Sequence, residues 1–291
     1  MIAQYHKLAL TIGFALAMAF TFSCSGDGGG GDNNPSTGIS SSSDNGGSSS
    51  SGGNSSGGSS SSSDVSSSSS EQSSSSVEIP KCGTLEYNPE THLCDLREQR
   101  LYKFVPIGEQ TWMAENLNYA VQGSKCYGES GTVKVGENII TLLPAEIQDN
   151  CIKYGRLYNW VAAMSGCPSG WRLPNNDDWN ALMKSANPSC SDVSTPCIGA
   201  GTKLKATSGW DDFNGSSGNG DNASGFSAMP GGYGNEAYQF VKAGELGYWW
   251  SFSDEEGKAY SLGMGNLSDA AAMSNYDKGS LRSVRCLKNT P

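Results

Sequence analysis

Hydrophobic residues first recur at helical spacing in the segment YGRLYNWVAAMSG. Leu157, Trp160, Val161 and Met164 occupy positions i, i+3, i+4 and i+7, which places them on one face of a helix. Gly166 comes directly afterwards and favours the end of that helix. The pattern therefore predicts a short amphipathic helix whose apolar face is turned toward a core.

A second helix is predicted directly after the segment SGCPSGWRLP. Asn175 or Asn176 can cap its first turn, because a short polar side chain at this position accepts a hydrogen bond from a free backbone N–H group. Asn187 and Pro188 end the pattern, since proline cannot continue a helix. The apolar face of this helix consists of Trp179, Leu182 and Met183.

Shorter runs of β-branched and aromatic residues, bounded by glycine and proline, predict strands. Asn88 and Pro89 favour a turn between two short strands, and Gly108 favours a second hairpin turn between LYKFVPI and QTWM. The segment 120–153 has no clear period and is interpreted as an irregular insertion. Further strands are predicted within 201–210, 225–234, 236–253, 258–265 and 280–288. The expected fold class is α+β, with two helices and many short strands.

The first part of the chain has a different character. Residues 1–24 contain an apolar run from Leu8 to Phe22, which would be roughly 22 Å long as a helix and therefore too short for a hydrocarbon layer of about 30 Å. No basic cluster follows the run. The segment is typical of a secretory signal peptide rather than of a permanent membrane span.

The end of this segment, TFSC, resembles the lipobox of bacterial lipoproteins. That resemblance implies cleavage before Cys24 and attachment of lipid to its sulfur, so that the protein would be anchored in a bilayer. Ser25 at the next position favours the outer membrane of a Gram-negative cell envelope, by analogy with other lipoproteins. The alternative is ordinary signal-peptide cleavage near Ser25 or Gly26, which would yield a secreted protein.

Residues 25–79 form a tract of serine and glycine without any aromatic residue. Such a polyserine segment cannot bury enough apolar surface to offset its chain entropy, so it is predicted to be a disordered linker. As a flexible coil it would span about 41 Å on average and roughly 180 Å at full extension. Residues 80–95 are then interpreted as a small cystine-closed hairpin, and residues 96–289 as the main domain.

The nine cysteines favour an oxidising compartment. If Cys24 carries lipid, eight remain, which is the even number that a disulfide framework requires. Local spacing favours three bridges, and the two cysteines that remain would form a fourth. The predicted pairs are Cys82 with Cys94, Cys126 with Cys151, Cys190 with Cys197, and Cys167 with Cys286.

The charge of the chain argues against nucleic acid as a partner. Only Lys7 of the 19 Lys and Arg residues precedes Pro80, as do six of the 29 Asp and Glu residues, so the remainder carries about −5. A basic stripe is absent from the sequence. Histidine chemistry is equally restricted, because His6 lies in the predicted signal peptide and leaves only His92.

Six motifs occur in an order that resembles the Fibrobacter succinogenes major paralogous domain family. They are IGEQTWMAENLNY, YGRLYNWVAAM, CPSGWRLPNNDDWNALM, GFSAMPGGY, YWWSFSDEEGKAY and SVRCLK. The resemblance extends from Leu96 to Lys288, and a lipoprotein signal followed by polyserine is also typical of this group. The family is in turn similar to formylglycine-generating sulfatase-modifying enzymes and to C-type lectins.

This resemblance implies a C-type-lectin-like domain, in which two helices pack on a twisted antiparallel sheet and long loops carry the binding surface. It also implies that a bridge joins Cys167 to Cys286. The modifying enzymes oxidise their substrate with a pair of cysteines near the C-terminus, but this chain has only Cys286 in that region. The catalytic function is therefore not expected here, and no catalytic residue is assigned.

Two binding sites are considered from the residues themselves. Tyr233, Trp249 and Trp250 are candidates for stacking on sugar rings, although adjacent strand residues face opposite sides and at most one of the two tryptophans can point outward. The segment WDDFNGSSGNGDNASG is rich in oxygen donors, which calcium prefers. Its candidate calcium ligands are Asp211, Asp212 and Asp221.

Three functions remain open at this point. The first is a non-catalytic binding domain on a lipid-anchored stalk, with a polysaccharide or a surface protein as partner. The second is an enzyme with an unrecognised carboxylate or metal site on the same fold. The third is a structural protein of the cell envelope. No cofactor is expected, apart from the calcium considered above.

Overall fold

The computed structural model describes residues 79–192 and 194–290. The predicted signal peptide, the Cys24 anchor and nearly all of the predicted linker lie outside the described residues. Among the helices of the described part, none is long and apolar enough to cross a membrane.

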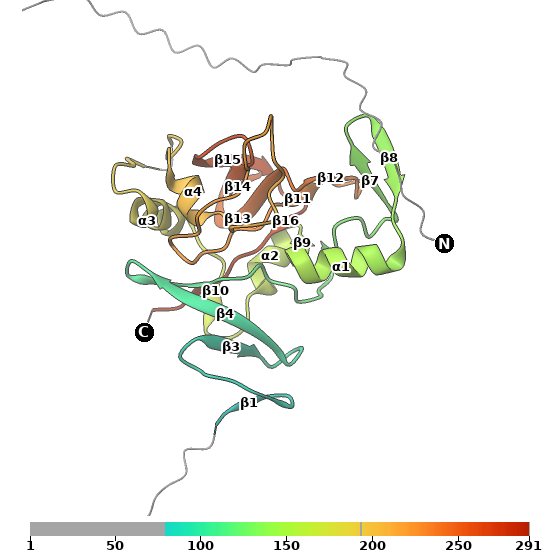
Figure 1. The fold of residues 1–291 in the computed structure, drawn as a ribbon. Helices are drawn as coiled ribbons and strands as arrows, with labels where there is room; N and C mark the ends of the chain where they lie inside the picture. The colour runs from blue at the N-terminus through green and yellow to red at the C-terminus, as the bar shows by residue number, and fades with distance from the viewer. Residues whose placement is uncertain (1–78, 193, 291) are drawn as a thin grey trace, which may run out of the picture. The chain divides into compact units, whose positions relative to one another are not determined.

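The described chain is mostly sheet, with helices packed against it (Figure 1). The helices are α1 (Pro144–Tyr154), α2 (Trp160–Gly166), α3 (Asn176–Ala186) and α4 (Ala200–Leu204). The strands before α2 are β1 (Lys81–Cys82), β2 (Leu85–Glu86), β3 (His92–Asp95), β4 (Arg100–Ile107), β5 (Gln110–Met113), β6 (Ser124–Lys125), β7 (Thr132–Val135), β8 (Asn138–Thr141) and β9 (Leu157–Tyr158). The strands after α2 are β10 (Trp171–Arg172), β11 (Gly231–Gly234), β12 (Phe240–Ala243), β13 (Leu246–Glu255), β14 (Lys258–Gly265), β15 (Ala271–Asp277), β16 (Arg282–Ser283) and β17 (Leu287–Lys288).

These strands form a two-stranded, a five-stranded and a ten-stranded sheet. The five-stranded sheet has the order β10-β17-β5-β4-β3, so the C-terminal strand β17 lies between β10 and the early β4–β5 hairpin. In the large sheet, the order is β6-β9-β16-β13-β11-β12-β7-β8, and β14 and β15 extend it from the other edge of β13. This α+β architecture with four disulfides agrees with the predicted fold class at that level of detail.

The central strand β13 is covered on both faces. Trp249 packs in one apolar cluster with Trp179 of α3, whereas Trp250 packs in a second cluster with Ala162 of α2. Both tryptophans are 0% exposed. Since successive residues of a strand point to opposite faces, the adjacent pair supplies one large ring to each of the two layers.

The predicted second helix is confirmed as α3. The side chain of Asn175 accepts a hydrogen bond from the backbone N–H of Asp178, and the Asp178 carboxylate accepts one from the backbone N–H of Asn175. This reciprocal capping box explains why the helix begins at Asn176. The apolar face is buried as predicted and consists of Trp179, Leu182 and Met183.

The first predicted helix is shorter than expected, and its predicted face is only partly correct, since Trp160 and Met164 pack against the core but Val161 does not. Leu157 belongs to β9, and α2 begins only after Asn159, whose side chain accepts a hydrogen bond from the backbone N–H of Ala162. Val161 is 70% exposed, while the small residues Ala162 and Ala163 are buried. The i, i+3, i+4 pattern was misleading because small residues allow α2 to approach the sheet closely. The helix does end at Gly166.

The interpretation of residues 120–153 as irregular was wrong. This segment contains the β7–β8 hairpin and the helix α1. Pro144 is suited to the first turn of α1, and only Cys151 and Tyr154 are buried, so the apolar period is too sparse to be recognised. Similarly, the segment 201–210 contains α4 rather than a strand, and β15 was not predicted.

Residues 80–95 do not form one hairpin closed across Asn88 and Pro89. The strand β1 pairs with β2, and β3 pairs with β4. Asn88 does make a turn, because its carbonyl oxygen accepts hydrogen bonds from the backbone N–H groups of Thr91 and His92. The turn therefore separates two hairpins, and the disulfide from Cys82 to Cys94 joins them. The hairpin predicted at Gly108 is present as β4 and β5.

The four disulfides of the structure join the four predicted pairs. The longest bridge, between Cys167 and Cys286, spans a sequence separation of 119 residues. Cys167 follows α2 directly, and Cys286 is fully buried. The segment that contains Cys167 is part of the core, since Trp171 and Leu173 are buried in the same apolar cluster as Cys286.

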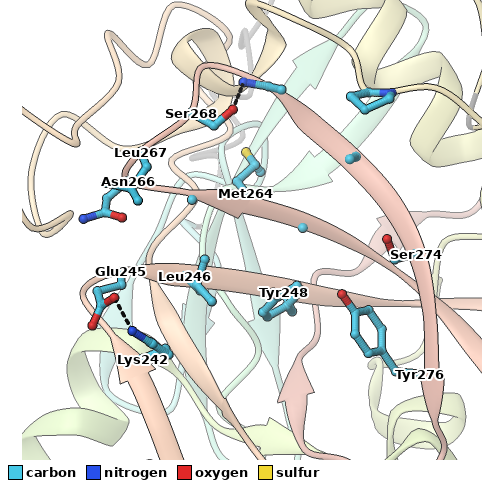
Figure 2. A pocket seen from close by; sticks show the side chains of 15 residues that line it. Lys242, Glu245, Leu246, Tyr248, Met264, Asn266, Leu267, Ser268, Ser274 and Tyr276 are labelled. Carbon is cyan, nitrogen blue, oxygen red and sulfur yellow. Dashed lines mark hydrogen bonds and ion pairs between the residues drawn. The ribbon is translucent and has the colours of Figure 1, made fainter. Parts of the chain in front are cut away.

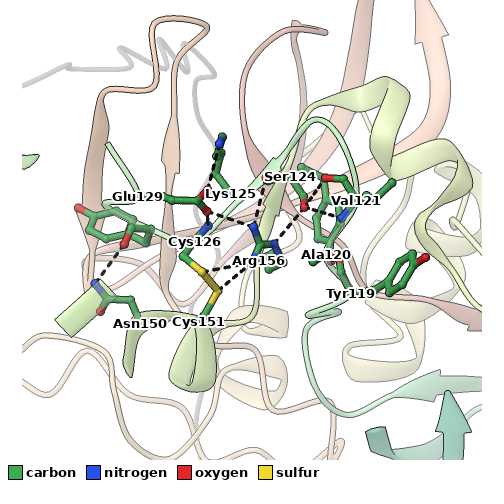
Figure 3. Close-up of a disulfide and its surroundings, with 12 residues drawn as sticks. Tyr119, Ala120, Val121, Ser124, Lys125, Cys126, Glu129, Asn150, Cys151 and Arg156 are labelled. Carbon is green, nitrogen blue, oxygen red and sulfur yellow. Dashed lines mark hydrogen bonds and ion pairs between the residues drawn. A yellow bond between two sulfur atoms is a disulfide. The ribbon is translucent and has the colours of Figure 1, made fainter. Parts of the chain in front are cut away.

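A charged side chain lies against the disulfide of Cys126 and Cys151 (Figure 3). Nη1 of Arg156 is 3.4 Å from the sulfur of Cys126 and 3.6 Å from that of Cys151. Nη2 of Arg156 also bonds Glu129 at 3.1 Å. Partial burial would raise the pKa of Glu129, but hydrogen bonds from the backbone N–H of Cys126 and from Lys125, together with the charge of Arg156, lower it overall. This network attaches the start of the β7–β8 segment to α1.

A polar network in the interior connects the early hairpin to the last strands. Asn116 and Arg285 are both buried. The amide oxygen of Asn116 accepts a hydrogen bond from Nη2 of Arg285 at 2.7 Å and from Nε1 of Trp249 at 2.8 Å. Burial lowers the pKa of Arg285 to about 9. The amide oxygen of Asn116 thus connects the motifs ENLNY and SVRC, which also meet where the backbone N–H of Leu117 donates to the carbonyl oxygen of Val284.

Candidate functional site

The strands β13, β14 and β15 form an open groove on one face of the large sheet (Figure 2). Its volume is about 530 Å³. The floor contains two small residues that face each other across neighbouring strands, Gly263 of β14 and Ala272 of β15. On its other side, Gly263 pairs with Tyr248 of β13. A Cβ atom at Gly263 would lie 2.9 Å from the ring of Tyr248. Glycine at this position therefore keeps the floor low and lets the tyrosine ring lie across it.

Tyrosine rings lie at one end of the groove. The rings of Tyr248 and Tyr276 meet edge to face with centroids 5.5 Å apart, and Tyr233 of β11 meets Tyr248 in the same way at 5.7 Å. All three side chains are partly exposed. Edge-to-face pairs of this kind stabilise one another and leave ring faces available to a ligand.

A buried arginine lies behind this aromatic end. The Cζ atom of Arg282 is 3.6 Å from the ring centroid of Tyr276, 4.6 Å from that of Tyr248 and 5.1 Å from that of Trp250. Arg282 is only 3% exposed. Burial lowers its pKa to about 10, and the neighbouring tyrosines and Asp277 act in the opposite direction. The guanidinium is therefore a charged group at neutral pH, enclosed mainly by rings.

Polar side chains lie at the opposite end of the groove. Nζ of Lys242 is 2.6 Å from a carboxylate oxygen of Glu245, and Asn266 and Ser268 follow at the end of β14. Lys242 has a φ of 66°, in the left-handed region that disfavours residues with a side chain. The strained backbone directs the Lys242 side chain back toward Glu245 across the turn into β13. The groove thus has an aromatic end, a small-residue floor and a polar end.

A comparison with family models identifies the wider group. Residues 105–288 match the Fibrobacter succinogenes major domain, which is more than half of the chain. The chain belongs to this family. The result confirms the family that the motifs resemble. A comparison with curated proteins finds no match, and a comparison with solved structures finds none either.

All the described residues that line the groove lie within residues 105–288, which match the Fibrobacter succinogenes major domain. The hairpin strands β1 and β2 precede the matched region. Whatever the groove does, it is therefore built by the segment that defines the family.

Of the predicted aromatic residues, Tyr233 is partly exposed and meets Tyr248, which lines the groove. Tyr233 itself is not one of the lining residues. Trp249 and Trp250 were assigned wrongly, because both are completely buried and cannot contact a ligand. The exposed rings of the site, Tyr248 and Tyr276, were missed. Tyr248 precedes the tryptophan pair and shares the face of Trp250, so strand alternation was the available signal.

The predicted calcium site is not formed by its three carboxylates. Within the described ranges, no group of three His, Cys, Asp or Glu side chains is arranged to hold a metal ion. Asp211, Asp212 and Asp221 are all exposed. The carboxylate of Asp221 accepts a hydrogen bond from the backbone N–H of Ala223 and so shapes a local turn.

A buried lysine, Lys205, binds this loop. Its ammonium group is buried and donates to the carbonyl oxygens of Gly218 at 2.7 Å, Ser268 at 3.1 Å and Gly265 at 3.2 Å. Burial lowers the pKa of Lys205, and the charge of Asp269 opposes this effect. A cation that the protein itself supplies thus joins the loop, at Gly218, to the end of β14.

Proposed function

We propose that the Fibrobacter succinogenes major domain of this protein is a non-catalytic binding module for polysaccharide, with a C-type-lectin-like fold. The observation that carries the proposal is the open groove over β13, β14 and β15, which combines tyrosine rings with amide and hydroxyl groups. Sugar rings stack their apolar faces on aromatic side chains and exchange hydrogen bonds with polar ones. An open groove, rather than a closed pocket, accommodates a chain that continues in both directions.

The charged groups of the groove favour binding over hydrolysis. Among the described residues that line it, Glu245 is the only one with a carboxylate, and this carboxylate is paired with Lys242. Most glycosidases need two carboxyl groups about 5 to 9.5 Å apart. Two other carboxylates of the domain have structural partners, since that of Asp178 belongs to the capping box of α3 and that of Asp254 binds Lys278.

A substitution on the floor of the groove tests the proposal. Ser274 is exposed and lines the groove, so the change Ser274→Trp would fill it with a large ring. We expect the affinity for polysaccharide to fall at least tenfold. Depletion of the full, disulfide-bonded chain from solution by insoluble polysaccharides measures this affinity, and a glycan array provides a second measurement.

The adjacent change Asn275→Trp is the matched control. Asn275 is also exposed, but strand alternation directs it to the other face of β15. The affinity of the Asn275→Trp variant for polysaccharide should stay within twofold of that of the parent chain. If the parent binds no polysaccharide, or if both variants bind as the parent does, the groove is not a polysaccharide site.

We also propose that this domain is held at a bilayer by lipid on Cys24 and displayed at the end of the serine-rich linker. The proposal rests on the sequence TFSC and on the even number of cysteines that remain. Cys24→Ser is expected to move the protein from the membrane fraction to the soluble one and to abolish labelling by radioactive palmitate. Unchanged fractionation of this variant would indicate that Cys24 carries no lipid.

A further inference from the structure

Arg282 differs from the other buried cations of the described chain in how it is satisfied. Arg285 and Lys205 donate hydrogen bonds to acceptors within the fold. Nε and Nη1 of Arg282 are buried and find no acceptor among the described residues. Its neighbours are instead the faces of aromatic rings.

Such an arrangement is costly for the folded state. A buried charge without hydrogen bonds loses most of its hydration, and cation–π contacts recover only part of that loss. A methionine or leucine of similar volume would fill the same space without this penalty. Stability therefore does not explain the presence of an arginine, which makes a role in binding the better explanation.

The position of Arg282 relates it to the groove. Tyr248 and Tyr276 line the groove, and the guanidinium lies against both rings. The hydroxyl of Ser261 on the neighbouring strand β14 is also buried without a partner in the described part of the chain. Ser261 pairs with Ser274 of the groove floor and with Trp250. Unsatisfied polar groups thus lie directly beneath the aromatic end.

The other charges around the groove do not cancel this one. Lys242 and Glu245 form an ion pair at the opposite end, so their net contribution is small. Asp277 is the acidic neighbour of Arg282, but it is exposed, and water screens its charge. The field of Arg282 instead passes through a nonpolar layer of rings, which screens a charge less than water does. The aromatic end of the groove is therefore electropositive.

We infer that Arg282 makes the groove selective for polysaccharides that carry carboxylate groups, with the acidic sugar bound at the tyrosine end. This inference rests on the proposed function and adds the class of polymer to it. The uncharged part of the sugar would stack on Tyr276 or Tyr248, while its carboxylate would lie toward Arg282. A neutral polymer would find the same rings but would lack the group that compensates the buried charge.

Matched polymers and two variants test the inference. The full, disulfide-bonded chain would be titrated with polygalacturonate and its methyl ester, and with carboxymethyl cellulose and hydroxyethyl cellulose. We expect the parent to prefer the acidic member of at least one pair by on the order of tenfold. Arg282→Met should abolish this preference, whereas Arg282→Lys, which keeps the charge, should retain part of it.

The controls separate folding from recognition. Arg282→Met should unfold at the same temperature as the parent or higher, because it removes a buried charge. Lys184→Met removes an exposed cation from α3, which packs against the Trp249 face of the sheet, and should leave the preference unchanged. Equal binding of acidic and neutral polymers, or an acidic preference that survives in Arg282→Met, would overturn the inference and leave the proposed function intact. Absence of binding to every polysaccharide would instead refute the proposed function.

Discussion

Arg285→Met is expected to lower the free energy of unfolding by about 3–5 kcal/mol. Arg285 is completely buried, and its guanidinium donates to the carbonyl oxygens of Met113 and Phe226 as well as to Asn116. Methionine fills a similar volume but leaves these carbonyl groups without a donor in a place that water does not reach. Urea unfolding of the disulfide-bonded chain, followed by tryptophan fluorescence, measures the effect.

A variant of Asn116, the partner of Arg285, allows the free energy of their hydrogen bond to be separated from the effect of a changed side-chain volume. Asn116→Leu is expected to cost a similar 3–5 kcal/mol, because it leaves a buried cation and Nε1 of Trp249 without their acceptor. In the double variant Asn116→Leu with Arg285→Met, the loss of unfolding free energy should be smaller than the sum of the losses measured for the two single variants. Residues that share one network show this kind of coupling.

An arginine near the surface is the control for this prediction. Arg172 binds Asp178, but 42% of its side chain is exposed. Arg172→Met should therefore cost about 1 kcal/mol or less, as is usual for exposed ion pairs. If Arg285→Met proved as stable as the parent, the Asn116–Arg285 network would not be what connects the early hairpin to the C-terminal strands.

The parts of the fold that could be predicted from sequence are those with strong local rules. The helix α3 has a cap, an apolar face and a proline stop within fourteen positions of each other, and all three act independently of the remaining chain. The hairpin at Gly108 is equally local, because its glycine has a φ of 60° that other residues rarely adopt. Such signals need no knowledge of which segments meet in space.

The parts that could not be predicted depend on contacts between distant segments. Trp249 and Trp250 looked like candidates for one exposed ring, but α2 covers one face of β13 and α3 covers the other. The cage of Arg282 is assembled from β11, β13, β15 and β16, so no window of sequence contains it. The oxygen-rich loop was considered as a calcium site from its composition alone. The sequence does not show that Lys205 binds the carbonyl oxygens of Gly218 within the loop and of Ser268 far beyond it.

The same distinction applies to the disulfides. Three bridges close local loops, with sequence separations of 7, 12 and 25 residues. The bridge from Cys167 to Cys286 closes almost the whole second half of the domain. It attaches the end of α2 to the segment between β16 and β17, next to the backbone N–H of Met113, which bonds the carbonyl oxygen of Cys286. Its loss would free the C-terminal segment of the unfolded chain from Cys167 and so raise the entropy of the unfolded state.

Removing this bridge is expected to have the largest effect of any single disulfide. In the chain-entropy description, a loop of 120 residues contributes about 5 kcal/mol, and a loop of 8 residues contributes about 2.5 kcal/mol. The double change Cys167→Ser with Cys286→Ser should therefore lower the free energy of unfolding about twice as much as Cys190→Ser with Cys197→Ser. Urea unfolding of the two variants measures the difference directly.

The single change Cys286→Ser should be more harmful still, because it leaves Cys167 half-buried but free to form mixed disulfides between chains. Non-reducing electrophoresis would show these as dimers, and peptide mapping would identify Cys167 at the junction. If the long and the short bridge proved equal in their contribution, loop closure would not be the source of the stability. In that case the packing of Cys286 beside Trp171 and Val284 would have to account for it, and replacement by alanine rather than serine would recover most of the loss.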